Sequence, residues 1–185
     1  LNANVCRDFH IPLQSGSNAV LQRMGRQYSA DEFLALTDSL KAQFDLPSIS
    51  TDIIVGFPGE RDTEYAETFD LVRAVGFSRL HVFRYSPRPG TPAAAFAGQV
   101  APQSANLRSS QLITLGKTLA ADYARLLVGK IEVLLLEESS TLLPGWVGYG
   151  ERYMRIHCAS EASPGSLIRV RITNNSGAEL LGYQV

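Results

Sequence analysis

The sequence predicts an α/β fold: part of a parallel sheet with its helices, followed by a small all-β barrel. Short apolar runs alternate with helical patterns through the first two thirds of the 185 residues, which indicates βαβ units. The last third alternates apolar and polar residues in short segments, as half-buried strands do. Gly129 separates the two patterns, so the predicted domains are residues 1–128 and 129–185.

The first predicted domain contains three strands and three helices. Ser29–Glu32 reads as a capping box that opens a helix ending before Pro47, and Gly76 is the expected C-cap of the next helix. Strands are expected over residues 9–13, 49–55 and 77–85, and the second and third helices over residues 62–75 and 103–128.

Three strands are too few to close a barrel, and they would leave a sheet edge open at the start of the chain. The first residue is Leu1 rather than Met. We therefore expect an incomplete domain. The second domain is expected to form four or five short strands, hence a small β-barrel. Its clearest candidates are residues 131–135, 152–157, 167–173 and 178–184.

Composition excludes some classes of protein. No apolar run approaches the roughly 20 residues of a membrane span, and no secretory signal opens the chain. Cys6 and Cys158 lack metal-ligand spacing, so we expect reduced thiols in a cytoplasmic protein and no metal site. Net charge is −1, without the basic excess typical of nucleic-acid binders. Fourteen of the 17 basic residues are Arg, which suits RNA but is equally explained by a GC-rich genome.

Polar and glycine-rich segments follow all three predicted strands. Because ligands bind at the carboxyl ends of parallel strands, these segments predict a ligand-binding rim. The alternative is tight turns that only cap helices. The segments are Gln14–Asn18, Gly56–Glu60 and Tyr85–Thr91.

Several rim residues suit particular ligand groups. Gln14 and Ser15 can bind a ribose or a carboxylate, and Gly56 lets the backbone approach a flat ring. Arg88 can hold a phosphate or carboxylate, or can be a solvated loop residue. There is no Walker loop, no Gly-x-Gly-x-x-Gly and no hydrolase elbow. Each of the isolated histidines is expected to be a packed or hydrogen-bonded strand residue: His10, His81 and His157.

Three long strings resemble signatures of the radical S-adenosylmethionine (SAM) methylthiotransferase family, in the family's order. The β-rich tail resembles the TRAM domain that follows the catalytic barrel in that family. The resemblance implies a partial radical SAM barrel followed by a TRAM or OB-like barrel. The strings are His10–Tyr28, Thr51–Glu60 and Tyr85–Ala93.

The resemblance also implies chemistry. SAM would be cleaved reductively by a [4Fe–4S] cluster, and a methylthio group would enter an unactivated C–H bond. The family's Cys-x-x-x-Cys-x-x-Cys motif is absent from this sequence. Since clusters need thiolate ligands, this chain alone is expected to be inactive.

Within the family, Phe77–Phe83 resembles the branch that acts on N6-threonylcarbamoyladenosine next to the tRNA anticodon. The alternatives are the branches that act on isopentenyladenosine or on a ribosomal protein. Two other classes stay open: a non-catalytic RNA-binding module, and a different SAM-using or nucleotide-binding α/β enzyme.

Roles carried over from the family fall into three groups. Arginines and aromatics on a small barrel suit single-stranded RNA, although a solvated polar face would look similar. SAM is expected at Gln14, Ser15, Ile54, Val55, Gly56 and Phe57; substrate at Tyr85, Arg88 and Thr91; and RNA at Arg152, Arg155, Arg169 and Arg171.

Overall fold

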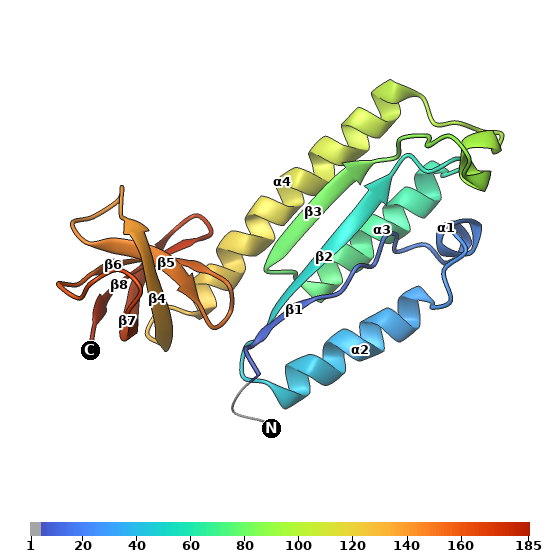
Figure 1. The fold of residues 1–185 in the computed structure, drawn as a ribbon. Helices are drawn as coiled ribbons and strands as arrows, with labels where there is room; N and C mark the ends of the chain where they lie inside the picture. Colours follow the sequence, from blue (N-terminus) through green and yellow to red (C-terminus); the bar gives the residue numbers. More distant parts are fainter. Residues whose placement is uncertain (1–4) are drawn as a thin grey trace.

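A computed structural model describes residues 5–185 (Figure 1). A three-stranded parallel sheet with helices is followed by a closed five-stranded barrel, which confirms the predicted fold class. The helices are α1 (Asn18–Arg23), α2 (Ala30–Gln43), α3 (Asp62–Val75), the 3-10 helix η1 (Pro92–Ala95) and α4 (Pro102–Leu126). The strands are β1 (Asp8–His10), β2 (Ser48–Val55), β3 (Arg79–Arg84), β4 (Ile131–Ser139), β5 (Trp146–Gly150), β6 (Arg155–Ala159), β7 (Leu167–Ser176) and β8 (Glu179–Gln184).

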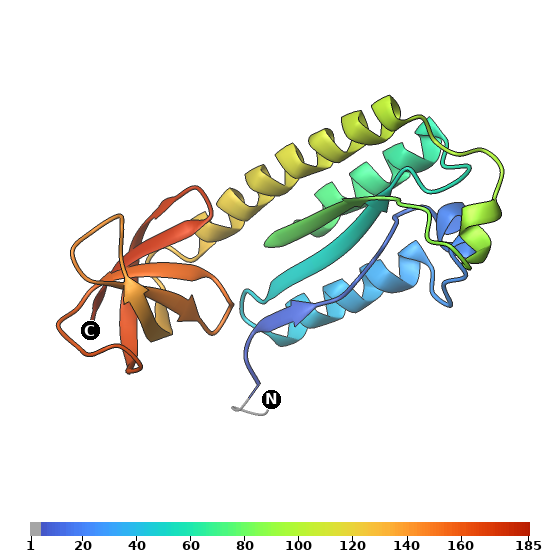
Figure 2. The same cartoon turned by 45° about the horizontal axis from the view of Figure 1, so that its top comes forward.

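The parallel sheet has the order β1-β2-β3 and two different faces. Alternate residues of β2, such as Ile53 and Val55, pack with Phe33 of α2, Val72 of α3 and Leu112 of α4 in one apolar core. Helices α2, α3 and α4 therefore lie on the same face (Figure 2). No described helix covers the opposite face, which we call the open face.

Local signals explain where the elements begin and end. Ser29 and Glu32 form the predicted capping box at the start of α2, and Gly76 ends α3 in the left-handed conformation at φ 69°. β1 is shorter than predicted because Pro12 has no N–H to donate. The Leu13 N–H then bonds to the Thr51 side chain instead of a strand partner.

The barrel has the strand order β4-β5-β6-β8-β7. In β7 the inward Ile168, Val170 and Ile172 are buried, and the arginines between them point outward, as the alternation predicts. β6 starts at Arg155, later than predicted, because Tyr153 adopts φ 52° in the turn before it.

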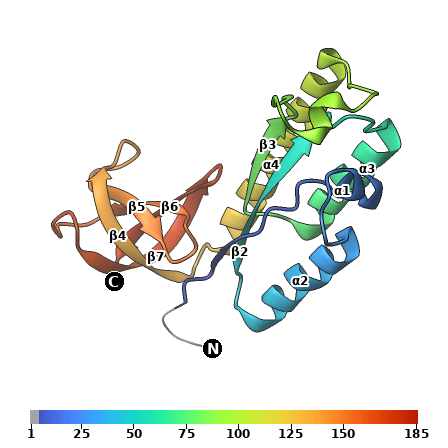
Figure 3. The same ribbon diagram turned by 45° about the vertical axis from the view of Figure 1, so that its right-hand side comes forward.

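The barrel lies at the end of the sheet where β2 begins, away from the strand ends that carry the predicted rim (Figure 3). Helix α4 joins the two ends, and at 1.5 Å per residue its 25 residues extend about 37 Å. Tyr123 and Ala124 of α4 belong to the barrel core, together with Leu127 beyond it. Among the described residues, no helix is long and apolar enough to cross a membrane.

A buried arginine joins the barrel to the sheet domain. Arg152 forms an ion pair with Glu132, and each side chain is at most 2% exposed. Its other nitrogens donate to the backbone carbonyls of Leu46, at 2.7 Å, and Asp45, at 2.8 Å. The Tyr123 hydroxyl donates to the same Leu46 carbonyl at 2.8 Å. The junction therefore consists of directed hydrogen bonds from Arg152 and Tyr123 to backbone carbonyls of the sheet domain.

Candidate ligand-binding rim and RNA-facing surface

The carboxyl ends of the three parallel strands form one cleft of about 510 Å³. Gln14 follows β1, Ile54 lies near the end of β2, and the segment after β3 supplies three further residues. Because the strands are neighbours and parallel, their ends meet at one edge. Five residues predicted to bind SAM or substrate line this cleft: Gln14, Ile54, Tyr85, Arg88 and Thr91.

The backbone of Gln14 holds the start of the rim in a fixed position. Its φ is 67°, the left-handed region that a non-glycine residue seldom adopts. The Gln14 N–H donates to the Asp52 carbonyl at 2.8 Å, and the Gln14 carbonyl accepts from the Ile54 N–H at 2.9 Å. Two bonds to β2 thus maintain a conformation that costs free energy and places the amide at the cleft.

Three residues predicted to bind SAM have other contacts. Ser15 Oγ is buried 3.1 Å from Thr68 Oγ1 and accepts from the Ser17 N–H. Val55 is fully buried in the core between sheet and helices. Phe57 packs against the Tyr85 ring, with centroids 5.1 Å apart. These side chains support the rim rather than line the cleft.

Gly56 lines a second cleft of about 670 Å³ beside the first, and Tyr85 lines both. A Cβ on Gly56 would lie 2.9 Å from Ala105 Cβ, and its φ is 75°, so glycine is needed here. The Tyr85 hydroxyl is buried and has no hydrogen-bond partner. Since a buried unpaired hydroxyl costs about 1–3 kcal/mol, this atom points to a ligand partner.

Two buried carboxylates hold the rim loop after β2. Glu60 accepts from the Gly56 N–H at 2.7 Å and from Arg108 of α4 at 2.6 Å. Burial raises the pKa of Glu60, against the hydrogen bonds from Gly56 and Arg108 that lower it. Glu64 of α3 pairs with Arg23 at 2.7 Å and with Arg61 at 2.9 Å.

The hydrogen bond from Arg23 is the largest cause that lowers the pKa of Glu64 to about 2. Arg23 also donates to the carbonyl of Gly59. Helices α1, α3 and α4 are thereby tied to one loop. Sequence reasoning missed this network, although Glu64 occupies the N3 position of α3, where a capping carboxylate is typical.

The four predicted RNA-binding arginines are not equivalent. Arg152 was expected on a strand facing RNA, but it lies in the turn before β6 and is buried at the domain junction. Arg155 is partly exposed and lies 3.6 Å from Glu138. Arg169 and Arg171 are exposed on the outer face of β7.

An aromatic stack lies beside the junction. The rings of Tyr149 and Tyr153 are parallel to within 15°, with centroids 4.5 Å apart. The guanidinium of Arg79, from the start of β3, lies 4.7 Å from the centroid of Tyr153. The sequence predicted aromatic residues beside the arginines of the barrel, but it gave no sign of Arg79, which comes from the other domain.

Comparison with known proteins identifies one matching family model and several similar proteins. Residues 1–72 match the family model described as Radical SAM superfamily. The chain is 39% identical to the tRNA-2-methylthio-N(6)-dimethylallyladenosine synthase of Helicobacter pylori (strain J99) over 97% of the chain and 42% of that relative. A protein of the same name from Frankia casuarinae is 46% identical over 73% of the chain and 25% of the relative. The chain thus spans less than half the length of these curated relatives.

Replacing Glu64 with Gln tests the network that holds the rim. Glu64 titrates at about 2 in the folded chain and near 4.5 when unfolded, so its stabilisation is present above pH 4.5 and is lost as the pH falls toward 2. We expect E64Q to lower the free energy of unfolding by about 3 kcal/mol at pH 7. In urea titrations, the difference between the two proteins should shrink below pH 4.5. A difference independent of pH would contradict the assignment.

Proposed function

The chain belongs to the radical SAM methylthiotransferase family, and we propose that it supplies the SAM-facing and substrate-facing part of an enzyme that transfers a methylthio group to adenosine in tRNA. The observation that carries this proposal is the convergence of three strand ends on one cleft. Gln14 and Arg88 offer polar groups there, Ile54 offers an apolar surface, and Tyr85 brings a buried hydroxyl without a partner.

The rim residues offer polar and apolar groups that suit the different parts of SAM. The Gln14 amide would bind a ribose hydroxyl or the methionine carboxylate. Ile54 and the backbone at Gly56 would border the flat adenine ring, because no Cβ intervenes at Gly56. Ser15, Val55 and Phe57 would keep these groups in place without touching the cofactor. In the whole enzyme, SAM cleaved reductively by an iron–sulfur cluster would supply the radical that activates a substrate C–H bond.

The cysteines do not fit an iron–sulfur cluster. Cys6 is exposed ahead of β1, whereas Cys158 is buried in the core of the β-barrel. Burial raises the pKa of Cys158 to about 11, so this thiol is not a ready thiolate ligand. We therefore propose that this chain by itself does not catalyse the reaction.

The substrate we propose is an adenosine carrying the dimethylallyl group, which is the isopentenyl group of the second branch considered above. The names of the curated relatives support this branch over the threonylcarbamoyl branch that the sequence favoured. The stretch Phe77–Phe83 discriminates poorly for a physical reason. Phe77 is 1% exposed and belongs to the core, and Ser78 bonds to Ser48. Phe83 gives the cleft apolar surface for the dimethylallyl group.

Threonylcarbamoyladenosine remains a second candidate on one observation. Its side group carries a carboxylate, and Arg26 and Arg88 both line the cleft. Neither arginine forms an ion pair with a described residue. In the proposal we favour, these guanidinium groups instead bind phosphates of the RNA near the modified nucleoside.

The outer face of β7 is the proposed RNA surface. The partner we propose is the anticodon region of tRNA. The proposed location is the cytoplasm, where tRNA is found. The side chains of Arg169 and Arg171 lie on the same outer face of β7. Tyr183 of β8 pairs with Arg171 in register and is 47% exposed. Exposed guanidinium groups beside an aromatic ring suit a single-stranded segment. Arg155 lies between Glu138 and Glu179 and would contribute less.

The substrate is tested by deleting the gene that encodes the chain and analysing tRNA nucleosides by mass spectrometry. We expect loss of the 2-methylthio form of dimethylallyladenosine and accumulation of the unmethylthiolated nucleoside. Loss of the methylthio form of threonylcarbamoyladenosine would instead establish the second candidate. A tRNA profile unchanged in both nucleosides would reject the tRNA function and leave a ribosomal-protein substrate or a non-catalytic role.

The RNA surface is tested by changing Arg169 and Arg171 together to Ala. Each lost phosphate contact lowers the slope of log affinity against log salt by about one unit or slightly less, so the double variant should lose between one and two units. The measurement is fluorescence anisotropy with an anticodon stem-loop over a range of salt. Arg73→Ala, on the outer surface of α3, is the control and should leave the slope unchanged. An unchanged slope in the double variant would remove β7 from the RNA surface.

A further inference from the structure

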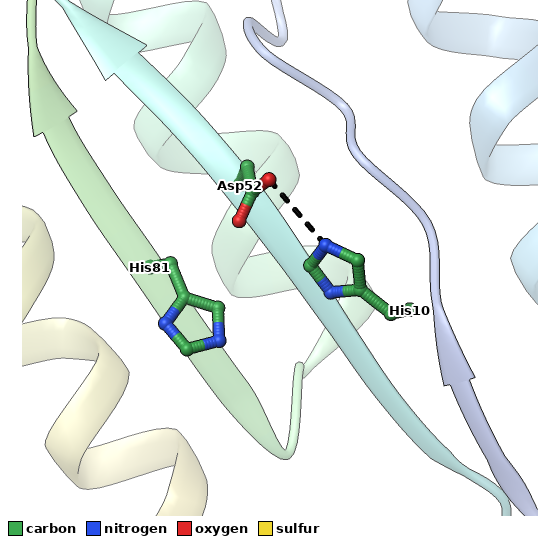
Figure 4. Close-up of side chains that lie close together, drawn as sticks. All are labelled: His10, Asp52 and His81. Atoms are coloured by element: carbon green, nitrogen blue, oxygen red, sulfur yellow. Dashed lines mark ion pairs between the residues drawn. The ribbon is translucent and has the colours of Figure 1, made fainter.

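Two histidines and an aspartate lie side by side on the open face of the sheet (Figure 4). His10 ends β1, Asp52 lies in β2 and His81 lies in β3, so each comes from a different strand. Asp52 and His81 are direct partners in the parallel register, and His10 pairs with Ser50 next to them on the same face. One ligand atom from each residue lies within 4.8 Å of the other two.

The hydrogen bonds of His10 leave a ring nitrogen directed at the carboxylate. Nδ1 lies 3.1 Å from Ser50 Oγ, and Nε2 lies 3.4 Å from Asp52 Oδ2. The tautomer protonated on Nδ1 donates to Ser50 and presents the Nε2 lone pair to Asp52. Two acceptor atoms then face each other, and both would bind a cation placed between them; the tautomer protonated on Nε2 would instead donate to Asp52 and accept from Ser50. A hydrogen-bonded second ring nitrogen is also the usual support of a metal-binding histidine.

Neighbouring cations do not fill this role. Arg79 is the nearest basic residue along β3, but it lies over the Tyr153 ring and 3.8 Å from Asp8. His10 is the only basic partner of Asp52 among the described residues. A proton on His10 would pair its imidazole with the Asp52 carboxylate. It would not give the nearby His81 ring any role in the cluster. Its ring nevertheless lies edge-on to His10, with centroids 5.9 Å apart.

We propose that His10, Asp52 and His81 bind a divalent transition-metal cation, with Zn²⁺ as the reference ion. Two imidazole nitrogens and one carboxylate on the same side of an ion form a set that leaves coordination positions open. Ligand atoms around tetrahedral Zn²⁺ lie about 3.3 Å apart, given bonds of about 2.0 Å. The ligand atoms, which lie within 4.8 Å of one another, would reach this spacing by rotation of the side chains.

The open coordination positions would face the cleft at the strand ends. Asp52 lines that cleft together with Gln14 and Ile54. A ligand in the cleft that offers an oxygen or nitrogen atom could therefore complete the coordination of the ion. The three proposed ligands include no residue assigned to SAM or to RNA, so metal binding can be tested without either, although Asp52 lines the cleft proposed for SAM.

The test is metal titration of the chain in a Cys6→Ser background, since the exposed thiol of Cys6 could bind the same ions. We expect one Zn²⁺ per chain by calorimetry and a Co²⁺ absorption band that Zn²⁺ removes. Asp52→Asn and His81→Ala should each weaken binding at least about tenfold, and Ser50→Ala should weaken it less. Asp70→Asn, an exposed aspartate on α3, is the control and should bind as the parent does.

A spectroscopic measurement does not depend on whether the variants fold. In ¹⁵N-detected histidine spectra of the parent chain, Zn²⁺ should shift the ring nitrogens of His10 and His81. It should leave those of His157 unchanged, because that ring is buried between Ser140 and Glu179. Absence of saturable 1:1 binding, binding unaffected by D52N and H81A, or shifts confined to His157 would each overturn the proposal.

Discussion

The buried side chain of Arg152, which an ion pair with Glu132 holds in place inside the β-barrel, is the constraint that fixes the barrel on the sheet domain. Both side chains are buried, and removing one partner of such a pair costs about 3–5 kcal/mol because the other charge stays unpaired. Arg152 also satisfies the carbonyls of Asp45 and Leu46, which belong to the sheet domain. The barrel therefore cannot turn on the sheet without breaking these hydrogen bonds, which would leave buried Arg152 donors and two carbonyl acceptors without partners. Tyr123 adds a hydrogen bond from α4 to the same Leu46 carbonyl.

This fixed junction determines how the two proposed surfaces relate. The cleft lies at the carboxyl ends of the strands, and the barrel lies at their amino ends, with α4 extending about 37 Å along the sheet. An RNA held by Arg169 and Arg171 has to extend along the molecule to bring a nucleoside to Gln14 and Tyr85. The rim is held as firmly as the junction, because buried Glu60 and Glu64 tie its loop to three helices.

The fold was predictable because its signals are local. The capping box at Ser29 and the alternation along β7 each depend on a few neighbouring residues, and both appear in the structure. Contacts set by register were not predictable. His10 and His81 looked isolated in the sequence, yet parallel pairing brings them to Asp52. Arg152 looked like part of an exposed strand, but a left-handed residue after it makes a turn that directs it inward.

The most direct test of the fixed junction is the distance distribution between spin labels at Thr63, in the first turn of α3, and Glu137, on β4, measured by electron–electron double resonance. Both labels replace exposed residues, and Cys6 is changed to Ser. We expect one narrow distance in the parent and a broad distribution in Arg152→Met, and adding Glu132→Met should leave it broad because methionine cannot donate to the Asp45 and Leu46 carbonyls. A broad distribution in the parent, or an equally narrow one in Arg152→Met alone, would contradict the fixed junction.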